Sequence, residues 1–105
     1  MPILQGPKKL VWTNHSQAKM RYYGLSQGRI KRVLNAPERV EEGIAPGTIA
    51  FMQLVKNAKN PYEIWAMIVE SKKERRVVSA WRYPGRTKPG DPLPEAILAE
   101  MREVE

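Results

Sequence analysis

The sequence lacks cysteine altogether and contains only one histidine, His15, among its 105 residues. Without cysteine the chain forms no disulfide, offers no thiolate to a metal and has no cysteine nucleophile. One histidine without a second histidine or a cysteine is also a poor set of metal ligands, so we expect neither a metal nor another cofactor. The absence of cysteine fits a reducing compartment.

Long apolar runs are missing as well. No stretch approaches the length of a membrane span, and residues 1–9 lack the apolar core of a signal peptide. The sequence therefore predicts a cytoplasmic protein that does not enter a membrane. It also lacks the glycine-rich nucleotide-binding motifs and the G-x-S-x-G nucleophile motif, which argues against the enzymes built on them.

The composition is that of one globular domain with an excess of basic residues. Hydrophobic residues make up 42% of the chain and charged residues 28%, so we expect a single domain over residues 1–105. Eighteen lysines and arginines against eleven acidic residues give a net charge of +7. Such a surface attracts polyanions, above all nucleic acids, although an acidic protein partner or plain solubility explains the same charge.

The stretch TNHSQAKMRYYG predicts a first helix over residues 14–23. Thr13 or Asn14 can cap it, because a side-chain oxygen there accepts a hydrogen bond from a free backbone N–H. Gly24 can end it, since glycine adopts the left-handed conformation at little steric cost.

A second helix is predicted over residues 27–35. Ser26 can cap this helix, and Leu25 and Ile30 have the spacing of a hydrophobic staple around that cap. Pro37 ends the helix, because the residue before a proline is pushed out of the α-helical region.

Three strands follow, which we predict over residues 49–55, 63–70 and 76–82. Short connections between consecutive strands favour an antiparallel meander. Residues 9–12 can add a further short strand, whereas residues 38–47 are expected to form a loop because they contain turn-forming glycine and proline.

The predicted fold class is α+β. Two N-terminal helices pack on a small antiparallel sheet of three to four strands, and a C-terminal helix over residues 95–104 completes the domain. Residues 1–8 are expected to form a flexible arm, and residues 84–94 a proline-rich loop before the last helix.

Short motifs in the first helical stretch resemble a known family. The chain reads HSQAKM from His15, GLS from Gly24 and VLNAP from Val33. This pattern resembles a group of small bacterial domains of unknown function with the sequence H-A-x-x-R-M, then R-G-I-S, then V-L-x-x-P. The group is similar to the BrnT toxins and, more distantly, to the RelE ribonuclease toxins. VVSAWR from Val77 also resembles the R-I-I-S-A-R strand of BrnT, and the resemblance covers most of residues 13–83.

The resemblance implies a RelE-like fold and a toxin of a toxin–antitoxin pair. Such a protein is a metal-independent ribonuclease or translation inhibitor, acts on RNA that is free or bound to the ribosome, and is neutralised by an acidic antitoxin. Its chemistry needs a group that titrates near neutral pH and fixed cations beside the phosphate. We therefore predict four catalytic residues. They are a histidine, a lysine one helical turn later, and a cation and a phenol from the third strand: His15, Lys19, Arg82 and Tyr83.

The alternative for His15 is structural, because a histidine in the first turn of a helix often caps backbone groups or packs beside a strand. The remaining cations of the helices and of the third strand form the predicted nucleic-acid-binding set. Its members are Arg21, Arg29, Arg32, Lys72, Lys73, Arg75 and Arg76. The basic run at 72–76 has an alternative explanation as a solvated hairpin that protects the sheet edge.

Two other functions remain open from the sequence. One is a non-catalytic RNA- or DNA-binding module, which exposed aromatic residues on a basic face would favour. The other is a protein-interaction domain, which a large exposed apolar patch with dispersed charge would favour.

Overall fold

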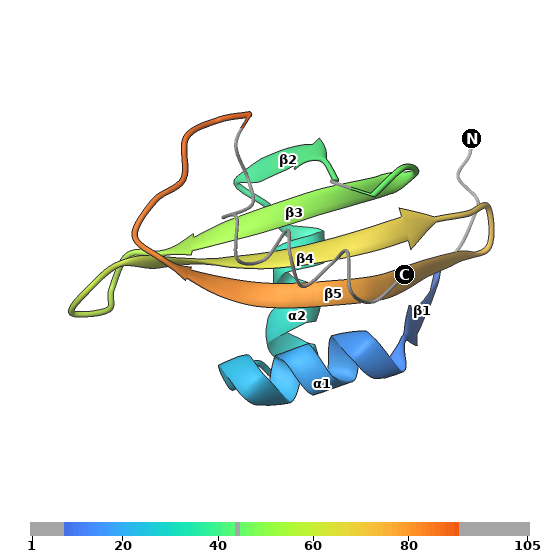
Figure 1. Cartoon of the computed structure of the whole chain (residues 1–105), viewed down its shortest axis with the longest axis horizontal. Coiled ribbons are helices and arrows are strands. Elements are labelled where there is room, and N and C mark those ends of the chain that lie inside the picture. Colours follow the sequence, from blue (N-terminus) through green and yellow to red (C-terminus); the bar gives the residue numbers. More distant parts are fainter. Residues whose placement is uncertain (1–7, 44, 91–105) are drawn as a thin grey trace.

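A computed structural model describes residues 8–43 and 45–90. The elements in these residues are β1 (Lys9–Trp12), α1 (Asn14–Tyr23), α2 (Gln27–Asn35), β2 (Arg39–Glu42), β3 (Thr48–Val55), β4 (Tyr62–Glu70) and β5 (Glu74–Pro84). The strands form one five-stranded sheet in the order β1-β5-β4-β3-β2 (Figure 1). The structure is therefore mostly β, with two helices packed against one sheet.

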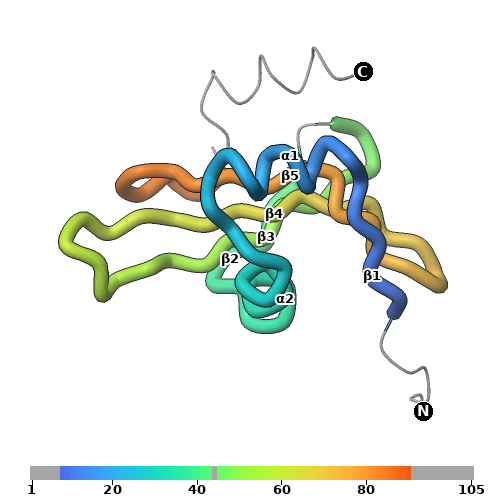
Figure 2. Tube along the Cα trace, turned by 90° about the horizontal axis from the view of Figure 1, so that it is seen from below, coloured from blue at the N-terminus to red at the C-terminus, as the bar shows by residue number. Residues whose placement is uncertain are grey.

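The sheet is mixed, because β1 runs in the same direction as its neighbour β5, whereas the other neighbouring strands run in opposite directions. β2, β3, β4 and β5 pair antiparallel with their neighbours, as the short connections predict. β1 pairs parallel with the first residues of β5, from Lys9 opposite Glu74 to Trp12 opposite Val77. β1 ends at Trp12, opposite Val77, and α1 then runs alongside the rest of β5 (Figures 1 and 2).

Both predicted helices form with the predicted punctuation. Thr13 caps α1, since its Oγ1 accepts a hydrogen bond from the backbone N of Ser16 at 3.1 Å. Gly24 ends α1 in the left-handed conformation, with φ of 69°. Ser26 caps α2, and its Oγ accepts from the backbone N of Arg29 at 3.0 Å. Local sequence therefore determines where these helices begin and where α1 ends.

The two faces of the sheet bury different sets of side chains. α2 packs over β3 and β4, and the face it covers, called the helix face below, contains Phe51, Ile64, Ala66, Val77 and Ala80 together with apolar residues of the helices. The opposite face, called the tryptophan face, contains Ala50, Met52, Trp65, Met67 and Trp81. The rings of Trp65 and Trp81 stack with centroids 5.7 Å apart, and both side chains are fully buried. The tryptophans of β4 and β5 are thus core residues.

A bulge in β5 changes which residues share a face. Ile68 pairs with Val77 and Met67 pairs with Ser79, so Val78 is the extra residue in β5. Val77 consequently lies on the helix face although Ser79, two positions later, lies on the opposite one. A strict alternation of faces along β5 therefore fails at Val78.

The predicted fold class is also wrong. It has an antiparallel sheet of three to four strands, whereas the structure has a mixed sheet of five strands, and the RelE-like architecture implied by the resemblance does not describe it. The parallel pairing of β1 is a contact between distant parts of the chain, and nothing in the residues of β1 itself specifies its direction. The predicted C-terminal helix over residues 95–104 lies outside the described residues.

The predicted loop over residues 38–47 contains the strand β2, which pairs with β3 at the edge of the sheet. Its sequence, Arg-Val-Glu-Glu, has no apolar alternation, and Val40 is 53% exposed. An edge strand of this kind depends on pairing and on the polar contacts of Arg39 and Glu41 rather than on an apolar face, so hydrophobic periodicity does not reveal it.

Two glycines give a stability test with opposite signs. We expect Gly24→Ala to lower the free energy of unfolding by about 1–2 kcal/mol, because a Cβ is strained at φ of 69° even though no atom lies within 4 Å of it. Gly28→Ala, inside α2, should raise it by about 0.5–1 kcal/mol, since the only neighbour of the added Cβ is Ser26 Oγ at 3.9 Å. Urea denaturation of both variants measures the difference, and equal effects would show that helix punctuation is not what Gly24 provides.

Candidate nucleic-acid interface

Three cations line a cavity of about 450 Å³ on the helix face. The cavity lies at the end of the molecule that carries the β4–β5 hairpin and the start of β1, two elements that Figures 1 and 2 show near each other. They are Lys8 before β1, Lys31 on α2 and Arg75 on β5. Glu70 is the only acidic residue among the lining residues, and its Oε2 accepts from Lys8 Nζ at 2.7 Å and from Arg75 Nε at 3.1 Å. One carboxylate therefore holds two cations in place and leaves the cavity with a net positive charge.

Glu70 is ionised over a wide pH range for the same reason. The hydrogen bond from Lys8 lowers the pKa of Glu70, and Arg75 adds to the shift through its own hydrogen bond and its charge, against the opposing effect of burial. The side chains of Lys8, Glu70 and Arg75 are each 25–30% exposed, so an anion that enters the cavity meets cations that are already positioned.

The outer side of α2 extends this positive charge. Arg29 is half-buried and Lys31 and Arg32 are exposed, and none of the three forms an ion pair with any residue in 8–43 or 45–90. Charge is also distributed unevenly along the chain. Positions 91–105 hold five of the eleven acidic residues and one of the eighteen basic ones, so the described part is far more basic than the net charge of +7 suggests.

His15 lies on α1, where its side chain is half-buried. Its Nε2 is shielded from solvent and has no hydrogen-bond partner in the described part of the chain. Burial lowers the pKa of His15, and the nearby charge of Lys19 lowers it further, so the ring is neutral at pH 7. A shielded Nε2 is poorly placed to take a proton from a substrate, and this geometry favours the structural interpretation of His15.

Lys19, one helical turn after His15, lies near two aromatic rings as well as near the histidine. Its Nζ lies 5.5 Å from the ring centroids of both Tyr22 and Tyr23. Burial lowers the pKa of Lys19. Tyr22 is 78% exposed, which makes it an accessible aromatic ring on a basic part of the surface.

The two predicted catalytic residues of β5 lie on opposite faces of the sheet. Arg82 shares the helix face with Ala80, and its guanidinium lies 4.6 Å from the centroid of the Tyr62 ring. Tyr83 packs against the tryptophan face. The four predicted catalytic side chains are therefore not gathered at one site, and ribonuclease activity stays a prediction.

The predicted nucleic-acid-binding residues are also divided. Arg75 lies on the helix face, 5.4 Å from the centroid of Phe51, and lines the basic cavity. Its neighbour Arg76 points to the other face, where it donates to Glu74 at 3.1 Å. Lys72 and Lys73 are exposed at the tip of the β4–β5 hairpin. Arg21 is exposed on α1, at the other end of the helix face. Arg75 is thus the one predicted residue that lines the basic cavity; Arg29 and Arg32 lie on α2, which contributes Lys31 to it, and Arg76 lies on the other face.

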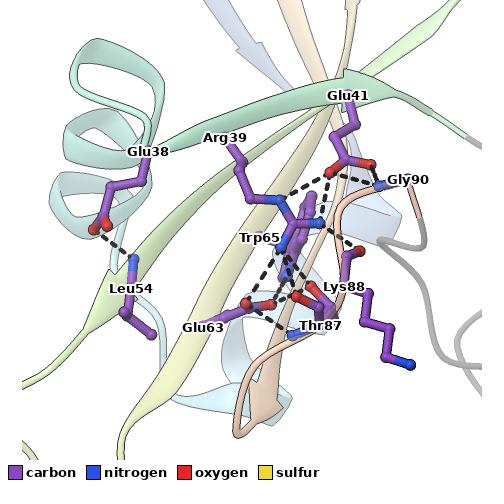
Figure 3. A network of polar contacts seen from close by, with 9 residues as sticks. All are labelled: Glu38, Arg39, Glu41, Leu54, Glu63, Trp65, Thr87, Lys88 and Gly90. Atoms are coloured by element: carbon purple, nitrogen blue, oxygen red, sulfur yellow. Dashed lines mark hydrogen bonds and ion pairs between the residues drawn. The ribbon is translucent and has the colours of Figure 1, made fainter.

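A buried polar network lies on the tryptophan face (Figure 3). Glu63 is 1% exposed, and its Oε1 accepts from Trp65 Nε1 at 2.8 Å and from Thr87 Oγ1 at 2.7 Å. Its Oε2 accepts from the backbone N of Thr87 at 3.0 Å and lies 3.6 Å from the guanidinium of Arg39.

Arg39 joins this network to the loop after β5. It donates to the carbonyl oxygens of Thr87 and Lys88, pairs with Glu41 and lies 5.2 Å from the centroid of Trp65. The backbone N of Gly90 in turn donates to Glu41. Because both oxygens of Glu63 are occupied, this carboxylate holds the loop against the sheet and is not available as a catalytic base.

Sequence reasoning missed Lys8, Lys31, Glu63 and Tyr62. Lys8 belongs to a stretch predicted to be a flexible arm, yet it pairs with Glu70, sixty-two positions away. Glu63 directly precedes the apolar run of β4, and an acidic residue inside such a strand is the signal that marks a buried, paired charge.

Comparison of the chain with protein-family models, curated proteins and solved structures found no match. Neither α1 nor α2 is long and apolar enough to cross a membrane. Within residues 8–43 and 45–90, no three histidine or acidic side chains are grouped closely enough to hold a metal ion.

We expect the protein to lose much of its stability when the buried acid of the polar network, Glu63, is removed. Glu63→Ala should lower the free energy of unfolding by about 3–5 kcal/mol, because Arg39 and Trp65 lose a buried partner. The matched control is Glu42→Ala on β2, an exposed position where we expect a change within about 0.5 kcal/mol. Urea denaturation of both variants measures the two changes. A small effect of Glu63→Ala would mean that the network does not hold the loop.

His15 predicts a pH dependence of stability. Its pKa is lower in the folded than in the unfolded chain, so the unfolded chain binds more protons, and the free energy of unfolding falls as the pH drops from about 6.5 towards the lower pKa of the folded chain. His15→Gln should flatten the free energy of unfolding over this range. The lowered pKa of Glu70 acts only below about 4.5, in a separate range. If the free energy of unfolding changed with pH equally in the wild type and in the variant between pH 7 and 5.5, this account would be contradicted.

Proposed function

We propose that this protein is a non-catalytic nucleic-acid-binding module that binds the phosphate backbone through the helix face. The observation that carries the proposal is the basic cavity at the hairpin end, where Lys8, Lys31 and Arg75 surround one carboxylate, Glu70. Fixed cations with a net positive charge suit a phosphate group, which accepts several hydrogen bonds at once.

The surface around the cavity supports contact with a polymer rather than with a single anion. Arg29 and Arg32 continue the positive charge along α2, and Lys72 and Lys73 continue it at the hairpin tip. A chain of phosphates placed along this surface would release a counterion at each contact, which is the main source of sequence-independent affinity. The tryptophan face differs, because Glu41 and Glu63 balance Arg39 there.

Catalysis is not part of this proposal. His15 Nε2 is shielded from solvent, and Arg82 and Tyr83 face opposite sides of the sheet. The toxin-type ribonuclease, its acidic antitoxin and a cytoplasmic location stay predictions from the sequence. Induced expression tests the first of them, since growth arrest with RNA cleavage would show an enzyme.

The binding test measures the affinity for a labelled 12-nucleotide RNA at several salt concentrations. Affinity should fall steeply with salt, and replacing both Lys31 and Arg32 by glutamine should reduce the slope of log K against log salt by about 1.4–1.8, or 0.7–0.9 for each lost phosphate contact. Glutamine keeps the helix propensity, and both positions are exposed, so the fold should be retained.

The matched control is Lys88→Gln, which removes a charge from the loop that crosses the tryptophan face. It should leave the slope unchanged. An equal loss of slope for each charge removed on either face would show that net charge, and not the helix face, attracts the RNA. Absence of salt-dependent binding by the wild-type protein would reject the proposed function.

A further inference from the structure

A second cavity, of about 370 Å³, lies on the helix face at the end opposite the basic cavity. Its lining residues come from the end of α1, the β3–β4 loop, the start of β4 and the end of β5; they are Tyr23, Asn60, Pro61, Tyr62, Arg82 and Pro84, with Gly85. β4 connects the two cavities, with Tyr62 at one end and Glu70 at the other. Eight residue steps along a strand place them about 26 Å apart.

Arg82 gives this cavity a cation that forms no ion pair with any residue in 8–43 or 45–90. Its guanidinium lies 4.6 Å from the centroid of the Tyr62 ring, and its Nε is shielded from solvent with no hydrogen-bond partner in the described part of the chain. No acidic residue is among the residues that line the cavity. A planar cation stacked on one ring presents its other side to a second planar group.

Aromatic rings of α1 lie beside the same cavity. Tyr23 lines it, and the exposed ring of Tyr22 meets Tyr23 edge to face with centroids 4.8 Å apart. Lys19 Nζ lies 5.5 Å from both centroids. The site therefore combines rings, a guanidinium plane and the amide of Asn60, which are the groups that bind unpaired bases.

We propose that this cavity takes an unpaired base of a nucleic-acid strand, so that the ligand of the helix face is single-stranded. The proposal rests on the function proposed above, which supplies the phosphate contacts at the far end of β4. The cavity volume is within the range of sites for small organic groups, and its lining is largely apolar. A base within a duplex would first have to leave its stack, which costs free energy, and the site therefore selects against paired strands.

The experiment compares three labelled probes: a 12-nucleotide RNA, a DNA of the same sequence, and the RNA annealed to its complement. Both single strands should bind more tightly than the duplex, by about five- to 100-fold for one stacked base. If only the RNA strand bound better than the duplex, the contact would be with the ribose and the base pocket would be rejected.

Two variants locate the effect. Arg82→Lys keeps the charge but removes the guanidinium plane, so the single-strand preference should fall severalfold while the salt slope stays unchanged. Tyr22→Ala changes an exposed ring and should reduce the preference without changing the melting temperature. The Lys31 and Arg32 double variant serves as the control, because it should weaken single strand and duplex alike.

The possible failures are distinguishable. Equal affinity of the wild-type protein for single strand and duplex would overturn the base pocket and leave the proposed function intact. A preference that survives in both Arg82→Lys and Tyr22→Ala would place the base elsewhere and overturn the pocket as well. Failure to bind any probe would reject the proposed function and this inference with it.

Discussion

The extra residue in β5 is the constraint on which the arrangement of the surface depends. Val78 has no partner in β4. Odd-numbered residues of β5 therefore face the helices before Val78 and face the opposite side after it. Val77 and Ala80 both reach the core under the helices, although they are three positions apart. Arg76 and Arg82, which share parity in the sequence, consequently lie on opposite faces, and this separates two cations that strict alternation would put together.

The bulge also coincides with a change in what covers the edge of β5. Up to Val77 the edge pairs with β1, and at this residue Thr13 donates from both its backbone N and its Oγ1 to the Val77 carbonyl oxygen. The same Oγ1 accepts from Ser16 and so begins α1. One threonine therefore ends the parallel pairing and begins the helix that runs along the rest of the strand. An edge protected in this way is not open to pairing with another chain.

The parts of the fold that the sequence predicts are those that local residues determine. Thr13, Gly24 and Ser26 act within a few positions of themselves, and the apolar strands β3, β4 and β5 are long enough to be recognised. The missed features depend on contacts between distant residues. The direction of β1 is set by β5, more than sixty positions later, and β2 is held by pairing with β3 and by the contacts of Arg39 to Thr87 and Lys88.

The candidate site could be predicted only in part for the same reason. Charge and the positions of Arg29, Arg32 and Arg75 are visible in the sequence, but the cavity also needs Lys8 and Glu70, which meet across sixty-two positions. The family resemblance predicts a catalytic role for His15 and Arg82. In the structure one of them is shielded and the other stacks on Tyr62.

The two faces of the sheet use charge in different ways, and the ligand proposed for the helix face depends on this difference. On the tryptophan face, both carboxylate oxygens of Glu63 accept hydrogen bonds. Arg39 donates to Glu41 and to two backbone carbonyl oxygens. The charged groups of this face therefore stabilise the fold. On the helix face Arg82 and the cations of α2 have no such partners within residues 8–43 and 45–90. Cations without such partners attract an anion from solution, and an extended anion is the ligand proposed for this face.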